Sequence, residues 1–258
     1  MSIVQRWRAW REDRTVARHA IPERLWQRTL DDHPFLARLS AADLLRLRRL
    51  CSLFLARKEF TGAHGLQVDD AMALAIAAQA CLPVLELGLA AYDGFVGIVV
   101  QPDEVLAERE TVDEDGVVHQ YGEALVGEAM AGGPVMLSWH DVAQAGQDAD
   151  RAFNLVIHEF AHVLDMGDGE ANGMPPLPDS RARQQWARVM ETEFELFCGQ
   201  IDAGHDTLLD PYGAEAPEEF FAVASEAFFV APRELHDERP ALYALLAGYY
   251  RQDPAGAA

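Results

Sequence analysis

The chain has 258 residues, of which 50% are apolar and 24% charged, and this composition is typical of a globular protein with one large hydrophobic core. Its 21 basic and 42 acidic residues give a formal net charge of −21, which argues against nucleic acid as a direct partner. The three cysteines, Cys51, Cys81 and Cys198, are far apart in the sequence. They predict neither a disulfide framework nor a CxxC metal site, and they fit a reducing cytoplasm.

No segment of the sequence predicts export or insertion into a membrane. The first eight residues turn basic without the apolar run of a signal peptide. The most apolar stretch, from Ala71 to Tyr92, is interrupted by Gln79, Pro83 and Glu86 before it reaches the length that crosses a bilayer. We therefore expect a cytoplasmic protein with no membrane partner.

The first half of the chain begins with helical patterns. Ser40 and Asp43 have the spacing of a capping box, and apolar residues then recur three and four positions apart as far as Phe54, which predicts an amphipathic helix. A second helical run covers Ala71 to Cys81, and Pro83 is expected to end it.

The pattern then changes to that of strands. Phe95 to Val100 is typical of a buried strand, and Thr111–Val112 and Val117–Val118 predict a hairpin around an Asp-Gly turn. Val135 to Trp139 predicts a further short strand, which we place at a sheet edge because Pro134 precedes it. An extended peptide substrate is expected to pair with such a strand.

Helical patterns return at about Asp150 and dominate to the end of the chain. A small mixed sheet followed by helices indicates the α+β class. We expect an N-terminal helical extension over residues 1–60 that packs on a catalytic domain over residues 61–254. Residues 255–258 are expected to be a frayed tail.

One His-Glu-x-x-His motif carries the chemistry. On a helix His158 and His162 lie on one face, so both imidazoles can bind a single zinc ion, while Glu159 is placed to take a proton from water at the metal. The alternative is a surface helix whose histidines are neighbours by chance. The segment from Leu155 to Leu164 is apolar nearly all round, and polar side chains in such a helix need partners, which favours the metal site.

A catalytic zinc needs a third protein ligand, and two candidates fit. Asp168 lies six residues after His162, but Asp165 occupies the position where that arrangement usually has glycine. Glu219 lies near the start of a later, strongly apolar helix, although Glu218 and Glu219 are also ordinary residues for the positive end of a helix. Spacing alone leaves both candidates open.

Several separate segments, in the right order, resemble the Mlc titration factor A family of bacterial zinc peptidases. The resemblance runs from about residue 20 to residue 254, and the segments that carry it are Cys81–Leu89, Asp93–Phe95, Gly133–Trp139, His158–Asp165, Asp210–Tyr212, Glu219–Phe229 and Tyr249–Pro254.

The resemblance implies a fold similar to the zincin catalytic domain of anthrax lethal factor. It implies zinc ligands at His158, His162 and Glu219, a general base at Glu159, and a tyrosine near the reacting carbonyl at Tyr212. It also implies aminopeptidase activity and the binding of an Mlc-like transcriptional repressor of sugar-uptake genes.

Three further residues have two interpretations each. Tyr212 lies in the loop that leads to Glu219, where its phenol either donates to an oxyanion or packs beside Pro211. Asp165 shares a helix face with both histidines and either holds an imidazole N–H or begins a turn. Glu226 has the same two interpretations.

The sequence therefore predicts a zinc-dependent peptidase that cleaves peptides. The main rival is a non-catalytic protein that binds a regulator and keeps a vestigial or structural metal site. Glu159 argues against this rival, since a structural site has no use for a glutamate beside the metal. A two-histidine, one-carboxylate iron oxygenase shares the ligand types but lacks the adjacent glutamate.

Overall fold

The computed structural model describes residues 3–103, 105–112, 118–125, 127–129, 132–145 and 152–256. The chain opens with helices and a first strand: α1 (Ile3–Arg18), α2 (Glu23–Asp32), α3 (Pro34–Ala37), α4 (Ala41–Leu55), β1 (Glu59–Gly62), α5 (Asp70–Cys81) and the 3-10 turn η1 (Leu89–Tyr92). The strands and a short helix follow: β2 (Gly97–Gln101), β3 (Val105–Val112), β4 (Val118–Leu125), β5 (Gly127–Ala129), β6 (Val135–Ser138) and α6 (Trp139–Gln144). The remainder is helical: α7 (Leu155–Asp165), η2 (Met166–Asp168), α8 (Ser180–Asp202), η3 (Pro211–Ala214), α9 (Pro217–Val230), α10 (Pro232–Glu238) and α11 (Pro240–Tyr250).

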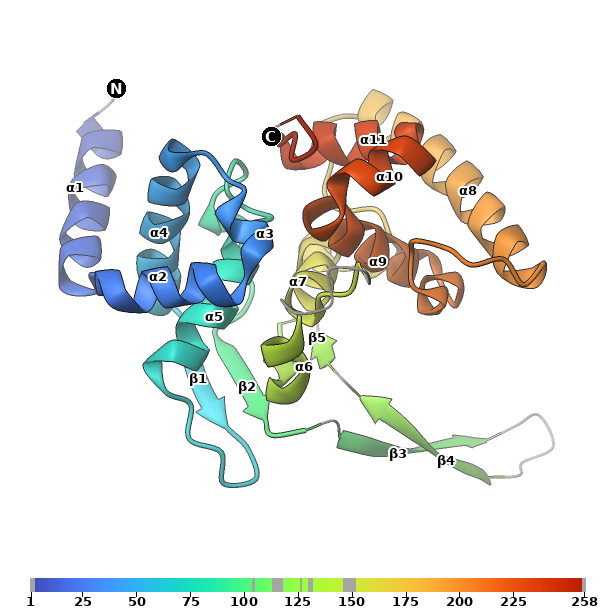
Figure 1. The fold of residues 1–258 in the computed structure, drawn as a ribbon, viewed down its shortest axis with the longest axis horizontal. Helices are drawn as coiled ribbons and strands as arrows, with labels where there is room; N and C mark the ends of the chain where they lie inside the picture. Colours follow the sequence, from blue (N-terminus) through green and yellow to red (C-terminus); the bar gives the residue numbers. More distant parts are fainter. Residues whose placement is uncertain are drawn as a thin grey trace.

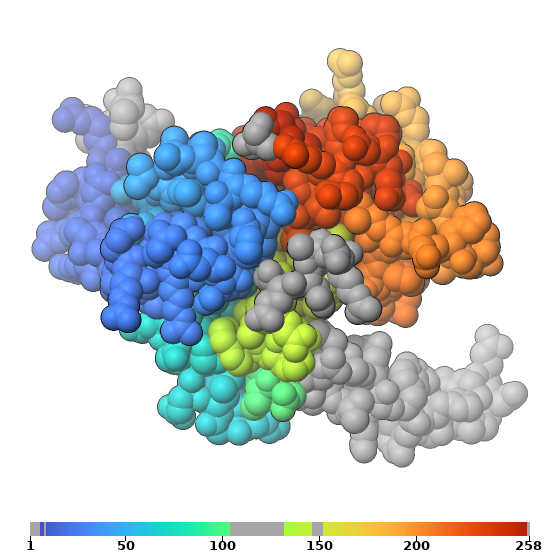
Figure 2. Space-filling model, viewed as in Figure 1, coloured from blue at the N-terminus to red at the C-terminus, as the bar shows by residue number. Residues whose placement is uncertain are grey.

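These elements form a mostly helical α+β structure in which α7 lies between two groups of helices. Helices α1 to α5 lie on one side and α8 to α11 on the other (Figure 1). The same division is visible on the surface, where the N-terminal helices and the C-terminal helices cover opposite sides of the molecule (Figure 2). Among the described residues, no helix is both long enough and apolar enough to cross a membrane.

The predicted helix starts are confirmed where side chains cap them. Ser40 accepts a hydrogen bond from the backbone N–H of Asp43 at the start of α4, and Asp69 does the same for Met72 at the start of α5. Helix α7 begins at Leu155, later than the helical pattern suggested, and Asp150 itself lies outside the described residues.

The main sheet has the strand order β1-β2-β6-β5. Strands β1, β2 and β6 are parallel, and β5 joins β6 in the antiparallel sense, so the sheet is mixed. The prediction that Val135–Trp139 lies at an edge is wrong, because β6 has a strand on each side and Trp139 already belongs to α6. Pro134 precedes β6 and therefore removes no hydrogen bond from within the strand.

The predicted hairpin is present and is longer than expected. Strands β3 and β4 pair antiparallel along their whole length, from Val105 opposite Leu125 to Val112 opposite Val118, and they extend away from the helices (Figure 1). Its predicted turn and Val117 fall in residues 113–117, outside the described residues.

Aromatic side chains fix α7 and α9 in the core. Phe160 of α7 packs against Tyr92 of η1 with ring centroids 5.0 Å apart, and against Phe54 of α4 at 5.8 Å. On α9, Phe220 packs against Phe197 of α8, and Phe228 stacks on Tyr250 of α11, each at 5.5 Å. Burial of such large side chains stabilises each helix by several kcal/mol, on the order of 1.5–3 kcal/mol per side chain. Helix α7 is thereby packed against α4 and η1, and α9 against α8 and α11.

Candidate metal centre

Helix α7 presents His158 and His162 on one face. Asn154 begins the helix by accepting a hydrogen bond from the backbone N–H of Ile157 on its side-chain oxygen. Because residues four apart lie one above the other on a helix, the two side chains extend from the same face. Their centroids are 4.9 Å apart and their Nε2 atoms 3.2 Å apart.

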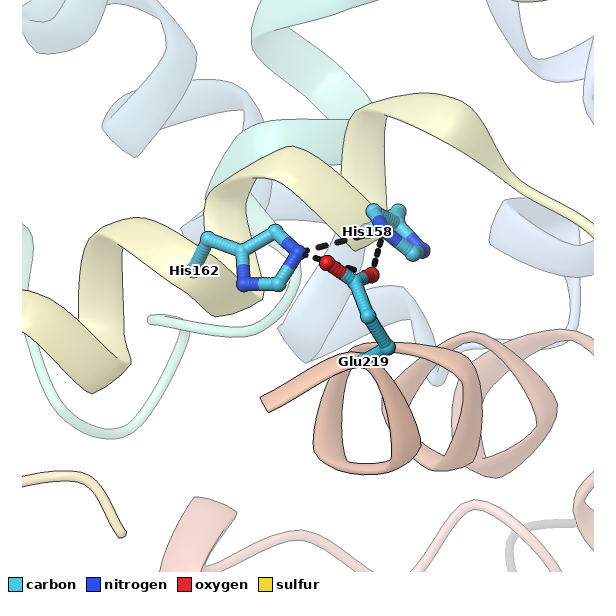
Figure 3. A group of neighbouring side chains, drawn as sticks. All are labelled: His158, His162 and Glu219. Carbon is cyan, nitrogen blue, oxygen red and sulfur yellow. Dashed lines mark hydrogen bonds and ion pairs between the residues drawn. The ribbon is translucent and has the colours of Figure 1, made fainter. Parts of the chain in front are cut away.

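The first turn of α9 brings Glu219 to these two nitrogens. Its Oε2 atom lies 3.0 Å from Nε2 of His158 and 3.3 Å from Nε2 of His162, and all three side chains point toward a common centre (Figure 3). One ligand atom from each residue lies within 4.8 Å of the others. Helices α7 and α9, which are distant in the sequence, therefore meet at these three side chains.

The donor set fits a metal ion. Two imidazole nitrogens and one carboxylate oxygen are the ligand types and the number that catalytic zinc sites use. The three side chains are largely buried, with exposed fractions of 10% for His158, 13% for His162 and 19% for Glu219. Such a site excludes most of the solvent.

The charges at this point are strongly coupled. Burial pushes the pKa of Glu219 up, but the hydrogen bonds with His158 and His162 outweigh it and hold that pKa at about 2. Burial alone would lower the pKa of His158, whereas its hydrogen bonds with Glu219 and Glu226 raise it well above the usual range. Both shifts favour the state in which Glu219 is an ionised carboxylate and His158 beside it is positively charged.

Glu159 lies beside the group without belonging to it. The side chain is 4% exposed, and no donor among the described residues reaches its Oε2 atom. Burial raises its pKa to about 7, although the neighbouring His158 and His162 oppose the shift. A buried carboxylate oxygen without a partner is costly, so its presence needs a chemical reason.

Asp168, the other candidate for the third ligand, lies apart from the group. It is exposed at the end of η2, where its Oδ1 atom accepts the backbone N–H of Glu170 at 3.4 Å. Among the described residues, the metal-ligating group contains Glu219 and not Asp168.

Asp165 and Glu226 turn out to differ. The Oδ2 atom of Asp165 accepts the backbone N–H groups of Asn172 and Gly173, at 2.8 and 2.7 Å, so this carboxylate anchors the loop after η2. The Oε1 atom of Glu226 lies 2.7 Å from Nδ1 of His158. Glu226 is therefore the carboxylate that holds an imidazole.

Tyr212 lies next to the group. Asp210 caps η3 by accepting the backbone N–H of Tyr212 at 2.9 Å, and the Tyr212 ring lies 6.1 Å from the ring of His158. The side chain is 44% exposed, so it contacts both the His158 ring and the solvent. A pocket of about 350 Å³ lies beside this loop, lined by residues that include Phe153, Pro211 and Glu226.

The sequence patterns did not identify two residues that support the site. Asn154 and Gln79 are both fully buried and hydrogen-bonded to each other, and Asn154 also contacts Glu226. An asparagine before an apolar helical run is a helix-start signal, which could have identified Asn154. Gln79 gives no such signal, because its partner is distant in the sequence.

Known proteins resemble this chain over nearly all of its length. The model of a family described as glucose-regulated metallo-peptidase M90 matches residues 7–251, so the similarity begins before residue 20. An uncharacterized protein of Synechocystis sp., slr2042, is 36% identical over 250 residues, covering 96% of this chain and 90% of that protein. Mlc titration factor A of Pectobacterium atrosepticum is 38% identical over 232 residues, 89% of this chain and 86% of that protein. Mlc titration factor A of Salmonella arizonae is 37% identical over 225 residues, which cover 86% of this chain and 88% of that protein.

Proposed function

The chain belongs to the glucose-regulated metallo-peptidase M90 family, and on that premise we propose that it is a zinc-dependent peptidase with a zincin-like fold. The ligands would be His158, His162 and Glu219, the one group of metal-ligating side chains found among the described residues. The convergence of these three side chains from two helices is the observation that carries the proposal (Figure 3).

Zinc held by these three residues would supply a Lewis acid, which would polarise a peptide carbonyl and lower the pKa of water toward neutral pH. Zinc is favoured over calcium and magnesium because two of the three donors are imidazole nitrogens. The three protein ligands leave room for water and substrate, as catalysis requires.

The chain's own residues then handle the protons and the developing charge. Glu159 is buried beside the ligands, with Oε2 free of hydrogen-bond donors from the described residues, so it can take a proton from the attacking water and return it to the leaving amine. Tyr212 borders the site, and its phenol donates a hydrogen bond to the oxyanion that forms from the substrate carbonyl.

The substrate is proposed to be a peptide cleaved from its N-terminus, which follows from the family resemblance. The division into a helical extension over residues 1–60, a catalytic domain over 61–254 and a tail over 255–258 stays a prediction, as does the cytoplasmic location. Residues 257–258 of that tail lie outside the described residues.

A second role is proposed from the relatives. Proteins 37–38% identical to this chain over most of its length carry the name Mlc titration factor A, which indicates binding to Mlc. We propose that this chain also binds an Mlc-like repressor. A protein that only binds the repressor is the alternative to a peptidase.

Metal content and activity test the peptidase. Purified protein is expected to bind about one zinc per chain and to hydrolyse N-terminally free peptides, to lose activity when a chelator removes the metal, and to recover it when zinc is restored. Elemental analysis and a peptide screen by mass spectrometry measure both. His162→Ala should lose most of the zinc, and Arg188→Ala on α8 is the control. Zinc bound equally by His162→Ala, or a zinc-loaded parent inert toward every peptide, would contradict the proposal.

Tyr212→Phe tests the oxyanion donor. The variant keeps the ring and loses only the hydroxyl, so we expect zinc to stay bound while kcat falls roughly 10- to 1000-fold. Tyr249→Phe, which removes a phenol from the C-terminal helix, is the matched control. Steady-state kinetics on one peptide distinguish the two, and an unchanged kcat in Tyr212→Phe would exclude this role.

A further inference from the structure

A buried carboxylate contacts the ring nitrogen of His158 that does not face Glu219. Glu226, on α9, is 1% exposed, and its Oε1 atom lies 2.7 Å from Nδ1 of His158. Its Oε2 atom accepts the backbone N–H of Asn154. With both oxygens engaged, the carboxylate has one orientation. The Nδ1–H group of His158 then donates to Glu226, and its Nε2 atom faces Glu219 and His162.

Asn154 connects this carboxylate to the start of the metal helix. Its backbone N–H binds Glu226, while its side-chain oxygen accepts the N–H of Ile157 at 2.9 Å as the cap of α7. Its side-chain amide donates to Oε1 of Gln79 at 2.7 Å. One residue thus fixes both where α7 begins and where Glu226 lies.

The chain of hydrogen bonds continues to the N-terminal helices. Gln79 on α5 donates from Nε2 to the carbonyl of Ala75 and to Nε2 of His33, both at 3.1 Å. His33, just after α2, donates from Nδ1 to the carbonyl of Thr29 at 3.0 Å. Burial lowers the pKa of His33, and in the neutral ring with its proton on Nδ1 the Nε2 atom accepts from Gln79. Every link therefore has a consistent donor and acceptor.

We propose that Glu226 is a positioning residue that fixes the tautomer and ring orientation of His158, and that Asn154 and Gln79 fix Glu226. In the neutral imidazole, a carboxylate that accepts the Nδ1–H leaves Nε2 without a proton and directed at the metal position. The linked side chains are buried, and in a buried position a satisfied polar network is rigid and a broken one is costly. This inference rests on the proposed metal centre.

Glu226→Gln replaces one oxygen of this carboxylate with an NH₂ group. A glutamine amide can accept from only one of its two donors, the ring N–H of His158 or the backbone N–H of Asn154, and its NH₂ group then faces the other. Either Asn154 loses its partner, or His158 must take the tautomer with the proton on Nε2. We expect zinc affinity to fall about 10- to 100-fold.

Two measurements on the full chain separate positioning from a purely structural role. Competition with a chelating dye gives the zinc affinity. Proton NMR of the cobalt-loaded protein reports the exchangeable Nδ1–H of His158, whose protection from solvent should be lost in Glu226→Gln.

Two further variants complete the design. Ser225→Ala removes a neighbouring buried hydrogen-bonding group on α9, whose hydroxyl contacts the carbonyl of Phe221 and the phenol of Tyr250 at 2.7 Å. It should lower the unfolding temperature and change zinc affinity less than threefold. Asn154→Ser keeps a good helix cap but removes the link to Gln79, and should weaken zinc about 2- to 10-fold. This variant carries the test if Glu226→Gln does not fold.

The outcomes distinguish this inference from the proposed function. If the parent binds no zinc, the metal centre itself is wrong. If the parent binds zinc, and Glu226→Gln and Asn154→Ser weaken it no more than Ser225→Ala, only the positioning role is overturned. Weaker zinc with loss of the protected Nδ1–H signal supports the role.

Discussion

Glu159→Gln is expected to leave zinc bound and to lower kcat by about 10²- to 10⁴-fold. Glu159 is not among the converging ligands, so the metal keeps all three protein donors. The amide cannot take a proton, although it has nearly the shape of the carboxylate and fits the same buried space. Steady-state kinetics and zinc analysis of the same preparation measure the two effects separately.

Glu195→Gln is the matched control, because it makes the same chemical change on an exposed position of α8. It should retain the parent's kcat. A kcat for Glu159→Gln within threefold of the parent would contradict its role as general base. Glu159→Gln should also still bind an Mlc-like repressor in a pull-down if that role is separate from catalysis.

Glu219→Ala is expected to abolish activity and to weaken zinc binding strongly, whereas Asp168→Ala should keep most of both. Glu219 is the carboxylate whose oxygen lies 3.0 and 3.3 Å from the two imidazole nitrogens. Without it, the two histidines lose their common partner and the metal loses its third protein ligand. Asp168 is a solvated residue at a turn, so its removal costs little.

Zinc titrations of the two variants under identical conditions give the comparison, and circular dichroism establishes that both are folded. If Asp168→Ala loses the metal and Glu219→Ala retains it, the assignment of the third ligand is reversed. The proposed place of Tyr212 near the reacting carbonyl would then fail as well, since η3 leads directly into the helix that carries Glu219.

Sequence patterns predicted the helices that build the site because those helices carry local signals. The long apolar runs of α7 and α9 are each visible within a few residues, as is the capping pattern at Ser40 that marks the start of α4. Spacing alone left Glu219 and Asp168 open, because neither candidate has a local pattern that shows which helix reaches α7. The resemblance to a known family indicated Glu219.

The features that were missed or mistaken depend on pairing between distant segments. Strand β6 was placed at an edge because Pro134 precedes it, but the short strand β5, which has no recognisable sequence pattern, pairs with its other side. Glu226 and Asp165 had equivalent interpretations, since helix periodicity tells which face a residue occupies and not what packs against that face. Gln79 is bonded to a residue 75 positions away, which no local pattern reveals.

Zinc-edge anomalous diffraction from crystals of the zinc-loaded chain tests the central claim most directly. The account predicts one strong peak between α7 and α9, about 2.0–2.1 Å from Nε2 of His158 and of His162, and within ligand distance of the Glu219 carboxylate. A zinc peak at any other place, or crystals from zinc-saturated solution without a peak at these three side chains, would contradict it.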